Sequence, residues 1–276
     1  MAGGSSSTKM VRRKPNPAAQ LTDDLLVEIL ARTLAGFFPE ESAPTRYCFT
    51  NVAGASCPLT FSFLPDRERE GLVLMDGCNG LLLFHCYRFP DEDEFDYIVL
   101  NPATEKWVAV PVTRRWSSKL QTVRLGFEPA VSSHFHVFEF QVDLDDDDYD
   151  AGDGNVLGVK IYSSATGAWS HKQSGWSMQI SLEPDFKSVF LDGVLYVNAR
   201  QSVVGSVDVE GKTWRIIDFP RSKDSAFYDT DVGFIDLSQG RLHLANDDDM
   251  VGDKLAIWVL EDKRQRRMDP KAHNQL

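Results

Sequence analysis

The sequence predicts a mainly β fold, an incomplete β-propeller of about three and a half to four four-stranded blades, preceded by a short N-terminal helix. Three observations predict it. Short segments rich in β-branched and aromatic residues, separated by turn residues, recur in sets of four from Leu72 onward. The unit Tyr97–Pro111, two strands around the turn Asn101-Pro102-Ala103-Thr104, recurs in two later sets. A tryptophan marks each copy of this unit: Trp107, Trp169 and Trp214.

The spacing of these tryptophans is that of a propeller blade. Trp169 and Trp214 are 45 residues apart. Trp107 and Trp169 are 62 residues apart, but that interval contains a 12-residue acidic insertion, 143–154, and 50 residues remain without it. A period of this size with four strands fits a blade. Because the three indole rings occupy equivalent positions, we expect them to pack between blades rather than to form ligand platforms.

The predicted strands fall into four sets. The first comprises Leu72–Met75, Leu81–Cys86, Asp96–Leu100 and Trp107–Val110, with the turn Asp76–Gly80 between the first two. The second comprises Val123–Phe127, His134–Val142, Val156–Tyr162 and Ala168–Lys172. The third comprises Ser188–Leu191, Val194–Asn198, Val203–Val209 and Thr213–Ile217, with Asp192-Gly193 as a hairpin signal. The fourth contains Asp231–Leu237, Arg241–Ala245 and Lys254–Leu260.

The fourth set lacks a predicted last strand. After Asp262 the chain reads KRQRRMDP, and Trp258 precedes its turn rather than following it. We therefore interpret 263–276 as a basic tail and expect the ring of blades to be incomplete or imperfectly closed.

The N-terminal part contains one predicted helix. Residues 1–20 are expected to be a disordered, solvated tail. The alternative interpretation is a nuclear localisation signal formed by the basic residues Lys9, Arg12, Arg13 and Lys14. Leu21–Leu34 follows as an amphipathic helix, and Thr22 is its predicted N-cap. Its apolar stripe consists of Leu21, Leu25, Leu26, Ile29, Leu30 and Leu34. This stripe either packs on its own domain or binds a partner. The segment that continues to Pro58 shows no clear periodicity and is interpreted as a linker.

Composition excludes several classes of protein. The chain has 276 residues with 29 basic and 41 acidic side chains, a net charge of −12, which argues against nucleic-acid binding. No apolar run reaches the roughly 18 residues that a membrane span requires, and we identify no secretory signal. The four cysteines are interpreted as reduced thiols of a cytoplasmic or nuclear protein.

Candidate metal-ligating residues are weighed against structural roles. Seven Asp residues lie in 143–153, but the pattern does not fit a calcium-binding loop, so a solvated insertion is expected. His134 and His136 alternate along one predicted strand without a third ligand nearby. Cys78 and Cys86 flank a hairpin, could lie near each other and are interpreted as buried structural thiols. We therefore expect no metal, no cofactor and no catalytic residue.

Several segments together resemble the plant F-box proteins that carry an F-box-associated, kelch-like β-propeller domain. Leu21–Leu34 resembles the first helix of an F-box, with Thr22 in place of the usual proline. The segments that resemble the associated domain, in the order of the family, are Asp76–Phe84, Asn101–Pro111, Gly126–Phe140, Tyr162–Trp169, Phe190–Ala199 and Leu255–Asp262. The propeller domain is therefore assigned to 59–262, and 21–58 is assigned to a degenerate or truncated F-box with its linker.

The resemblance implies a role as the substrate-recognition adaptor of a cullin-based (SCF-type) E3 ubiquitin ligase. The propeller would bind a target protein, and Leu21, Leu25, Leu26, Ile29 and Leu30 would dock the Skp-type adaptor. Ubiquitin transfer would then belong to partner subunits, and this chain would not be an enzyme.

Two other functions stay open. After Leu34 the chain lacks the Cys-Lys-x-Trp-like motif that ends a full F-box, which leaves a free-standing propeller binding module without a ligase link. A propeller enzyme would require carboxylates or histidines along a central channel, and no spaced set of such residues predicts one.

Overall fold

In this computed structural model, the described residues are 48–50, 56–58, 61–64, 72–87, 95–111, 122–143, 154–182, 186–200, 203–218, 233–247, 254–260 and 269–275. Across them no helix is long and apolar enough to span a membrane. The tail 1–20, the predicted helix Leu21–Leu34 and most of the acidic insertion lie outside these residues.

Among the described residues, four antiparallel four-stranded sheets form the propeller, and each is one blade. Blade 1 contains β3 (Leu72–Cys78), β4 (Leu81–Tyr87), β5 (Phe95–Asn101) and β6 (Lys106–Val110). Blade 2 contains β7 (Val123–Gly126), β8 (His136–Val142), β9 (Val156–Ser163) and β10 (Ala168–Gln173). Blade 3 contains β11 (Val189–Leu191), β12 (Val194–Ala199), β13 (Val203–Asp208) and β14 (Trp214–Asp218). Blade 4 contains β15 (Phe234–Ser238), β16 (Arg241–Asp247), β17 (Lys254–Val259) and β18 (Asp269–Gln275).

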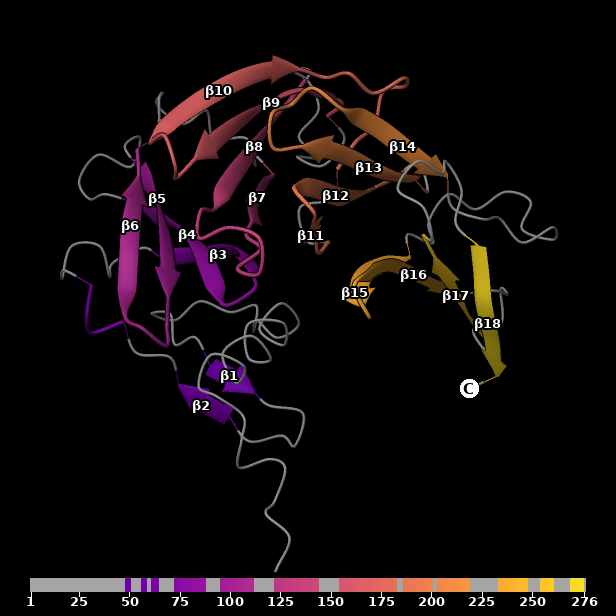
Figure 1. The fold of residues 1–276 in the computed structure, drawn as a ribbon, viewed down its shortest axis with the longest axis horizontal. Coiled ribbons are helices and arrows are strands. Elements are labelled where there is room, and N and C mark those ends of the chain that lie inside the picture. Colours follow the sequence, from indigo (N-terminus) through magenta and orange to yellow (C-terminus); the bar gives the residue numbers. More distant parts are fainter. Residues whose placement is uncertain are drawn as a thin grey trace, which may run out of the picture.

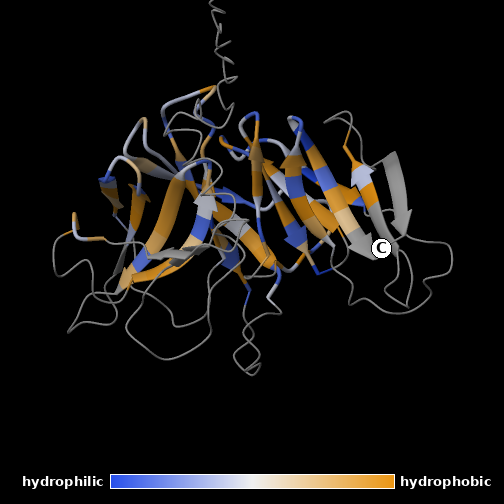
Figure 2. Cartoon of the chain, turned by 90° about the horizontal axis from the view of Figure 1, so that it is seen from below, coloured by the Kyte–Doolittle hydropathy of each residue, from blue (hydrophilic) through white to orange (hydrophobic). Residues whose placement is uncertain are grey.

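The blades are arranged as an open arc around a common centre (Figure 1). The first strand of each blade, β3, β7, β11 or β15, is the innermost, and the fourth strand is the outermost. β7 lies against both β3 and β11, and β11 lies against β15. Hydrophobic residues follow the strands and hydrophilic residues gather at many of the turns (Figure 2). The predicted β-propeller is therefore confirmed, with four blades.

The hairpins between the first and second strands of the blades explain why the sequence predicts how these strands pair. In blades 1, 3 and 4 the turn has two residues, Asn79-Gly80, Asp192-Gly193 and Gln239-Gly240. The first residue of each has a positive φ, of 46°, 49° and 53° respectively, and the glycine follows with φ of 70–88°. Two consecutive left-handed residues form the turn that matches strand twist, and Asn, Asp and Gly adopt it at low cost.

The repeated tryptophans occupy one register in three blades. Trp107 lies opposite Leu100, Trp169 opposite Tyr162 and Trp214 opposite Val207. Each tryptophan thus follows its partner by seven residues along the chain. In the turn before Trp107, the side chain of Asn101 accepts hydrogen bonds from the backbone N–H groups of Ala103 and Thr104 at 3.0 and 3.1 Å.

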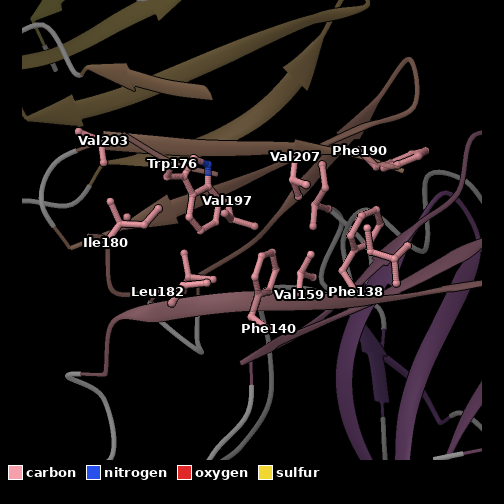
Figure 3. Close-up of a cluster of buried hydrophobic side chains, with 14 residues drawn as sticks. Phe138, Phe140, Val159, Trp176, Ile180, Leu182, Phe190, Val197, Val203 and Val207 are labelled. Atoms are coloured by element: carbon pink, nitrogen blue, oxygen red, sulfur yellow. The ribbon is translucent and has the colours of Figure 1, made fainter. Parts of the chain in front are cut away.

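The hydrophobic core consists of layers between successive blades. The layer between blades 2 and 3 is drawn in Figure 3, where Phe138, Phe140 and Val159 face Val197 and Val207. Trp176, from the connection between the blades, closes this layer by stacking on Phe140 and by meeting Trp214 edge to face. Equivalent layers lie between blades 1 and 2 and between blades 3 and 4.

The face of blade 1 that points away from blade 2 is covered by a segment that precedes the blade. Leu64 is buried in a cluster with Leu72, Leu82 and Phe84, and Phe61 packs edge to face on Phe84. Trp107 packs against the same cluster. Before this segment, β1 (Cys48–Thr50) and β2 (Ser56–Pro58) form a hairpin within the region that the sequence assigned to the linker.

The prediction that blade 4 lacks its last strand was wrong. β18 pairs with β17 along Asp269–Gln275, inside the predicted basic tail. This strand carries Pro270, which has no N–H to donate, and it alternates poorly in polarity. Pro270 lies opposite Trp258 at a register irregularity, and β18 is an outermost strand, the two settings in which a sheet tolerates proline.

Two predicted strand boundaries were also wrong. Asp76 and Gly77 belong to β3 rather than to the turn, because the strand is irregular between Leu74 and Asp76 and continues to Cys78. β8 begins at His136, so His134 lies in a loop instead of sharing one strand with His136.

Candidate partner-binding face

A partly buried carboxylate, that of Asp76 on β3, joins three blades at the centre of the arc. Its Oδ2 accepts hydrogen bonds from the backbone N–H of Leu125 in blade 2, at 2.7 Å, and from the hydroxyl of Ser188, just before β11, at 3.1 Å. Its Oδ1 accepts one from the N–H of Gly77 at 2.9 Å. The Asp76 side chain therefore links the first strands of blades 1, 2 and 3.

The guanidinium of Arg124 completes this centre. Arg124 is 4% exposed and donates hydrogen bonds to the carbonyl oxygens of Val123 and Phe186 at 3.0 and 2.9 Å. Burial raises the pKa of Asp76, and the positive charge of Arg124 acts in the opposite direction. We call Asp76, Arg124 and Ser188 the hub. Its geometry indicates a structural role, because all three side chains are engaged with the protein itself.

A second buried polar group lies between blades 1 and 2. The Tyr97 hydroxyl donates to Glu139 at 3.4 Å, and Lys160 forms an ion pair with the same carboxylate. Burial, and then the nearby Glu139 charge, raises the pKa of Tyr97. Burial lowers the pKa of His85, which contacts the Tyr97 ring, to about 4. Tyr97 and Glu139 are 0% and 2% exposed, so a dissolved substrate could not reach them without opening the blades.

Close to the hub lies the connection between β7 and β8, residues 127–135, which we call the projecting loop (Figure 1). It has nine residues where the matching turns of the other blades have two. Its base is fixed to blade 1, because Asn79 Nδ2 and Cys78 Sγ both donate to the Phe127 carbonyl, at 2.6 and 3.3 Å.

The projecting loop is also fixed to blade 3 and to its own blade. Glu128 Oε2 accepts a hydrogen bond from the Asp192 N–H at 2.7 Å. At the other end Phe135 and Ser164 bond twice, Phe135 N–H to the Ser164 hydroxyl at 2.9 Å and Ser164 N–H to the Phe135 carbonyl at 3.0 Å. Within the loop, the N–H groups of Val131 and Ser132 both bond to the Glu128 carbonyl at 2.9 Å. The loop is thus an ordered projection.

The three tryptophans singled out from the sequence lie half-buried on blade faces. Trp169 packs on the layer between blades 1 and 2, contacts Tyr97 and donates its indole N–H to the Pro111 carbonyl at 2.7 Å. Trp214 packs on the layer between blades 2 and 3. The candidate adaptor-docking residues Leu21, Leu25, Leu26, Ile29 and Leu30 lie outside the described residues.

Neither of the two pairs that the sequence analysis weighed as metal ligands lies where the sequence placed it. Cys78 lies opposite Leu81 and Cys86 opposite Leu72, so the two thiols stand at opposite ends of one hairpin. Burial raises the pKa of Cys78 to about 12, as expected for an inert thiol. His134 is exposed, whereas His136 stacks on Phe190. In the described part of the chain no three His, Cys, Asp or Glu side chains gather as a metal site.

Sequence reasoning missed the hub and the anchoring of the projecting loop. The sequence places Asp76 in a turn because Asp-Gly commonly forms one, and Arg124 lies within a short apolar segment. The signal for the loop was available, since Glu-Pro-Ala followed by Ser-Ser is poor strand sequence immediately after Phe127.

A family model describes the same part of the chain. The model of the F-box protein At3g26010-like β-propeller matches residues 55–273, which include the four blades except for the last two residues of β18. The chain belongs to this family. As an F-box-protein propeller it also resembles a curated relative, F-box protein At5g07610 of Arabidopsis thaliana, with 23% identity over 243 residues. That match covers 83% of this chain and 56% of the relative, so the chain spans about half the length of the relative.

Solved propellers are more distant. The WD40 β-propeller domain of Doa1 is 10% identical, with a TM-score of 0.36, over 72% of this chain and 51% of that one. A mutant Aleuria aurantia lectin in complex with alpha-methyl-L-fucoside is 11% identical, with a TM-score of 0.40, over 84% and 73% of the two chains. Neither likeness carries an argument about function.

Proposed function

We propose that this chain is the substrate-recognition subunit of a plant cullin-based (SCF-type) ubiquitin ligase. The observation that carries the proposal is membership of an F-box-protein propeller family over residues 55–273. In this proposal the kelch-like propeller binds a target protein, the predicted helix 21–34 docks the Skp-type adaptor, and the adaptor links the chain to the cullin scaffold.

The architecture supports this division of labour. A target must be held in a fixed position while another subunit transfers ubiquitin to it, and a scaffold of packed blades pinned at the hub provides such rigidity. Ubiquitin transfer is left to partner subunits, so we propose that the chain itself has no catalytic activity. The proposed location is the cytoplasm, the nucleus or both, where the partners of such a ligase would meet it.

A free-standing propeller binding module is the second candidate. One observation favours it: the chain after Leu34 lacks the Cys-Lys-x-Trp-like motif of a full F-box. In this alternative the propeller binds the same kind of target without delivering it to a ligase.

Co-purification separates the two functions. The full chain is expressed together with a plant Skp-type adaptor and the N-terminal half of a cullin, and the complex is isolated through a tag on the cullin. The ligase proposal expects the chain to be retained and Leu25→Asp to abolish retention. A chain that is absent from the cullin complex, while remaining folded, would contradict the proposal and leave the binding module.

A further inference from the structure

Asn79 is the only asparagine of the sequence that is followed by glycine. In an Asn-Gly pair the glycine has no side chain to shield its backbone nitrogen, and this nitrogen can attack the side-chain amide of the asparagine. Asn79 and Gly80 form the turn between β3 and β4, with φ values of 46° and 88°. A chemically reactive pair therefore stands at the hairpin of blade 1 that contacts the projecting loop, residues 127–135.

The side-chain amide of Asn79 helps to fix the base of the projecting loop to blade 1. Its Nδ2 donates to the Phe127 carbonyl at 2.6 Å, and Cys78 Sγ donates to the same oxygen at 3.3 Å. Nδ2 is also the atom that leaves as ammonia when the Gly80 nitrogen attacks. The hydrogen bond to Phe127 must therefore break before ammonia leaves, and Gly80 is itself buried. Docking of the loop and loss of ammonia exclude each other.

A carboxylate at position 79 would not hold the loop. It offers an acceptor where the Phe127 carbonyl requires a donor, so two acceptors would face each other. Burial is the main cause of the raised pKa of the neighbouring Cys78 thiol. The negative charges of Asp76 and Glu128 raise that pKa further, against the effect of Lys187. A further negative charge would therefore be added beside two carboxylates that already act on this position.

We propose that Asn79 is a deamidation site, that docking of the projecting loop protects it, and that its conversion to aspartate or isoaspartate irreversibly releases the loop from blade 1. The Gly80 nitrogen forms a bond to Asn79 Cγ, the Cγ–Nδ2 bond breaks, and the Gly80 proton leaves with Nδ2 as ammonia. Water then opens the resulting succinimide ring at either of its two carbonyl groups. Water is the only co-reactant. This one-way loosening of the contact between blades 1 and 2 goes beyond the proposed ligase role and does not depend on it.

Mass spectrometry of the purified full chain tests the protection. The chain is incubated for several weeks in mildly alkaline buffer, folded or unfolded in urea, and each asparagine peptide is scored for the mass gain of an amide that becomes a carboxylate. Asn101 is the matched control, because its side chain also bonds within a turn but Pro102 follows it, whose nitrogen carries no proton. Conversion of Asn79 is expected to be at least about tenfold faster in the unfolded chain than in the folded one. Asn101 should not convert comparably in either state.

Hydrogen exchange tests the release of the loop. The converted fraction is separated by its additional negative charge, and Asn79→Asp supplies the aspartate form directly, since aspartate tolerates the left-handed backbone of this turn. Amides of the projecting loop are expected to exchange at least about fivefold faster in both samples than in wild type. Amides of β14 in blade 3 should exchange at the wild-type rate. Asn101→Asp adds the same charge to another turn and should leave exchange of the loop unchanged.

Three results would overturn the proposal. Equal conversion of Asn79 in the folded and unfolded chains, or none in the unfolded chain, would show that loop docking protects no reactive site. Wild-type exchange of the loop in the converted chain and in Asn79→Asp would show that the amide does not hold it. Faster exchange in β14 as well would mean that the whole propeller opens rather than the loop alone. The adaptor co-purification does not involve position 79, so failure of the ligase link and failure of this proposal are distinguishable.

Discussion

Asp76 determines how three blades meet, because its carboxylate accepts hydrogen bonds from Leu125 and Ser188 as well as from its own strand. Arg124, almost fully buried, supplies the opposite charge. A charge pair inside a protein adds little net stability compared with two apolar residues in the same place. Removal of one member, however, is costly, because the charge of the other member is no longer balanced. The hub therefore makes the relative placement of the blades sensitive to a single side chain.

Asp76→Ala is expected to lower the free energy of unfolding by about 3–5 kcal/mol, because it removes the negative charge beside Arg124 and leaves the Leu125 N–H without its acceptor. Asp236→Ala is the matched control. Asp236 pairs with Lys187 at the surface, where loss of the pair costs about 1 kcal/mol or less. Urea unfolding measures both. Similar small losses in the two variants would show that the hub does not hold the blades.

The lowered pKa of His85 predicts how the stability of the folded protein responds to acid. Burial lowers its pKa to about 4 in the folded protein, below its ordinary value of 6.5. Folding favours the neutral form of the His85 ring. The stability that results from this preference is therefore complete above pH 6.5 and is lost as the pH falls toward 4. His85→Gln removes this titration. The urea midpoint of the variant should therefore fall less between pH 7 and pH 4.5 than that of wild type, and parallel curves would contradict this origin of the acid sensitivity.

At the scale of elements, the segment 61–64 functions as part of blade 1 rather than as a linker. Leu64 is 2% exposed and Phe61 meets Phe84 edge to face. Without this cover, Leu72 and Leu82 of the blade face would contact water, since blade 2 packs on the opposite face.

Leu64→Ala is expected to destabilise the protein by about 2–5 kcal/mol, the usual cost of a cavity at a buried leucine. Ser62→Ala, two residues away and exposed, should stay within about 0.5 kcal/mol of wild type. Thermal unfolding of the two variants compares them directly. Equal melting temperatures would mean that the packing of segment 61–64 on blade 1 does not stabilise the protein.

The strands that sequence patterns predicted well are those with a strong local reason to form. β5 and β6 combine β-branched residues with an Asn-Pro turn, and β11 and β12 are joined by Asp-Gly. β18 was missed because an outermost strand pairs along one edge only and tolerates polar residues and Pro270. Only the ends of the projecting loop, Phe127, His134 and Phe135, are assigned to strands by the sequence, because Phe135 and Val137 continue an alternating pattern.

At the scale of the whole molecule, the repeat length predicted the blades because each blade is one supersecondary unit with the same packing requirement on both faces. The candidate site was less predictable. The hub depends on residues 49 and 112 positions apart in sequence, Asp76 with Leu125 and Ser188, and no local pattern links them. The projecting loop depends on hydrogen bonds from two other blades, which only the assembled arc provides.

The central claim is that adaptor docking and target binding belong to separate parts of one chain. A calorimetric titration with a purified Skp-type adaptor tests it most directly, using the wild-type chain, Ile29→Asp and, as a control within the propeller, Val131→Lys. The account predicts saturable binding by wild type and by Val131→Lys with equal affinity, and none by Ile29→Asp. Absence of wild-type binding at tens of micromolar, or loss of binding in Val131→Lys, would contradict it.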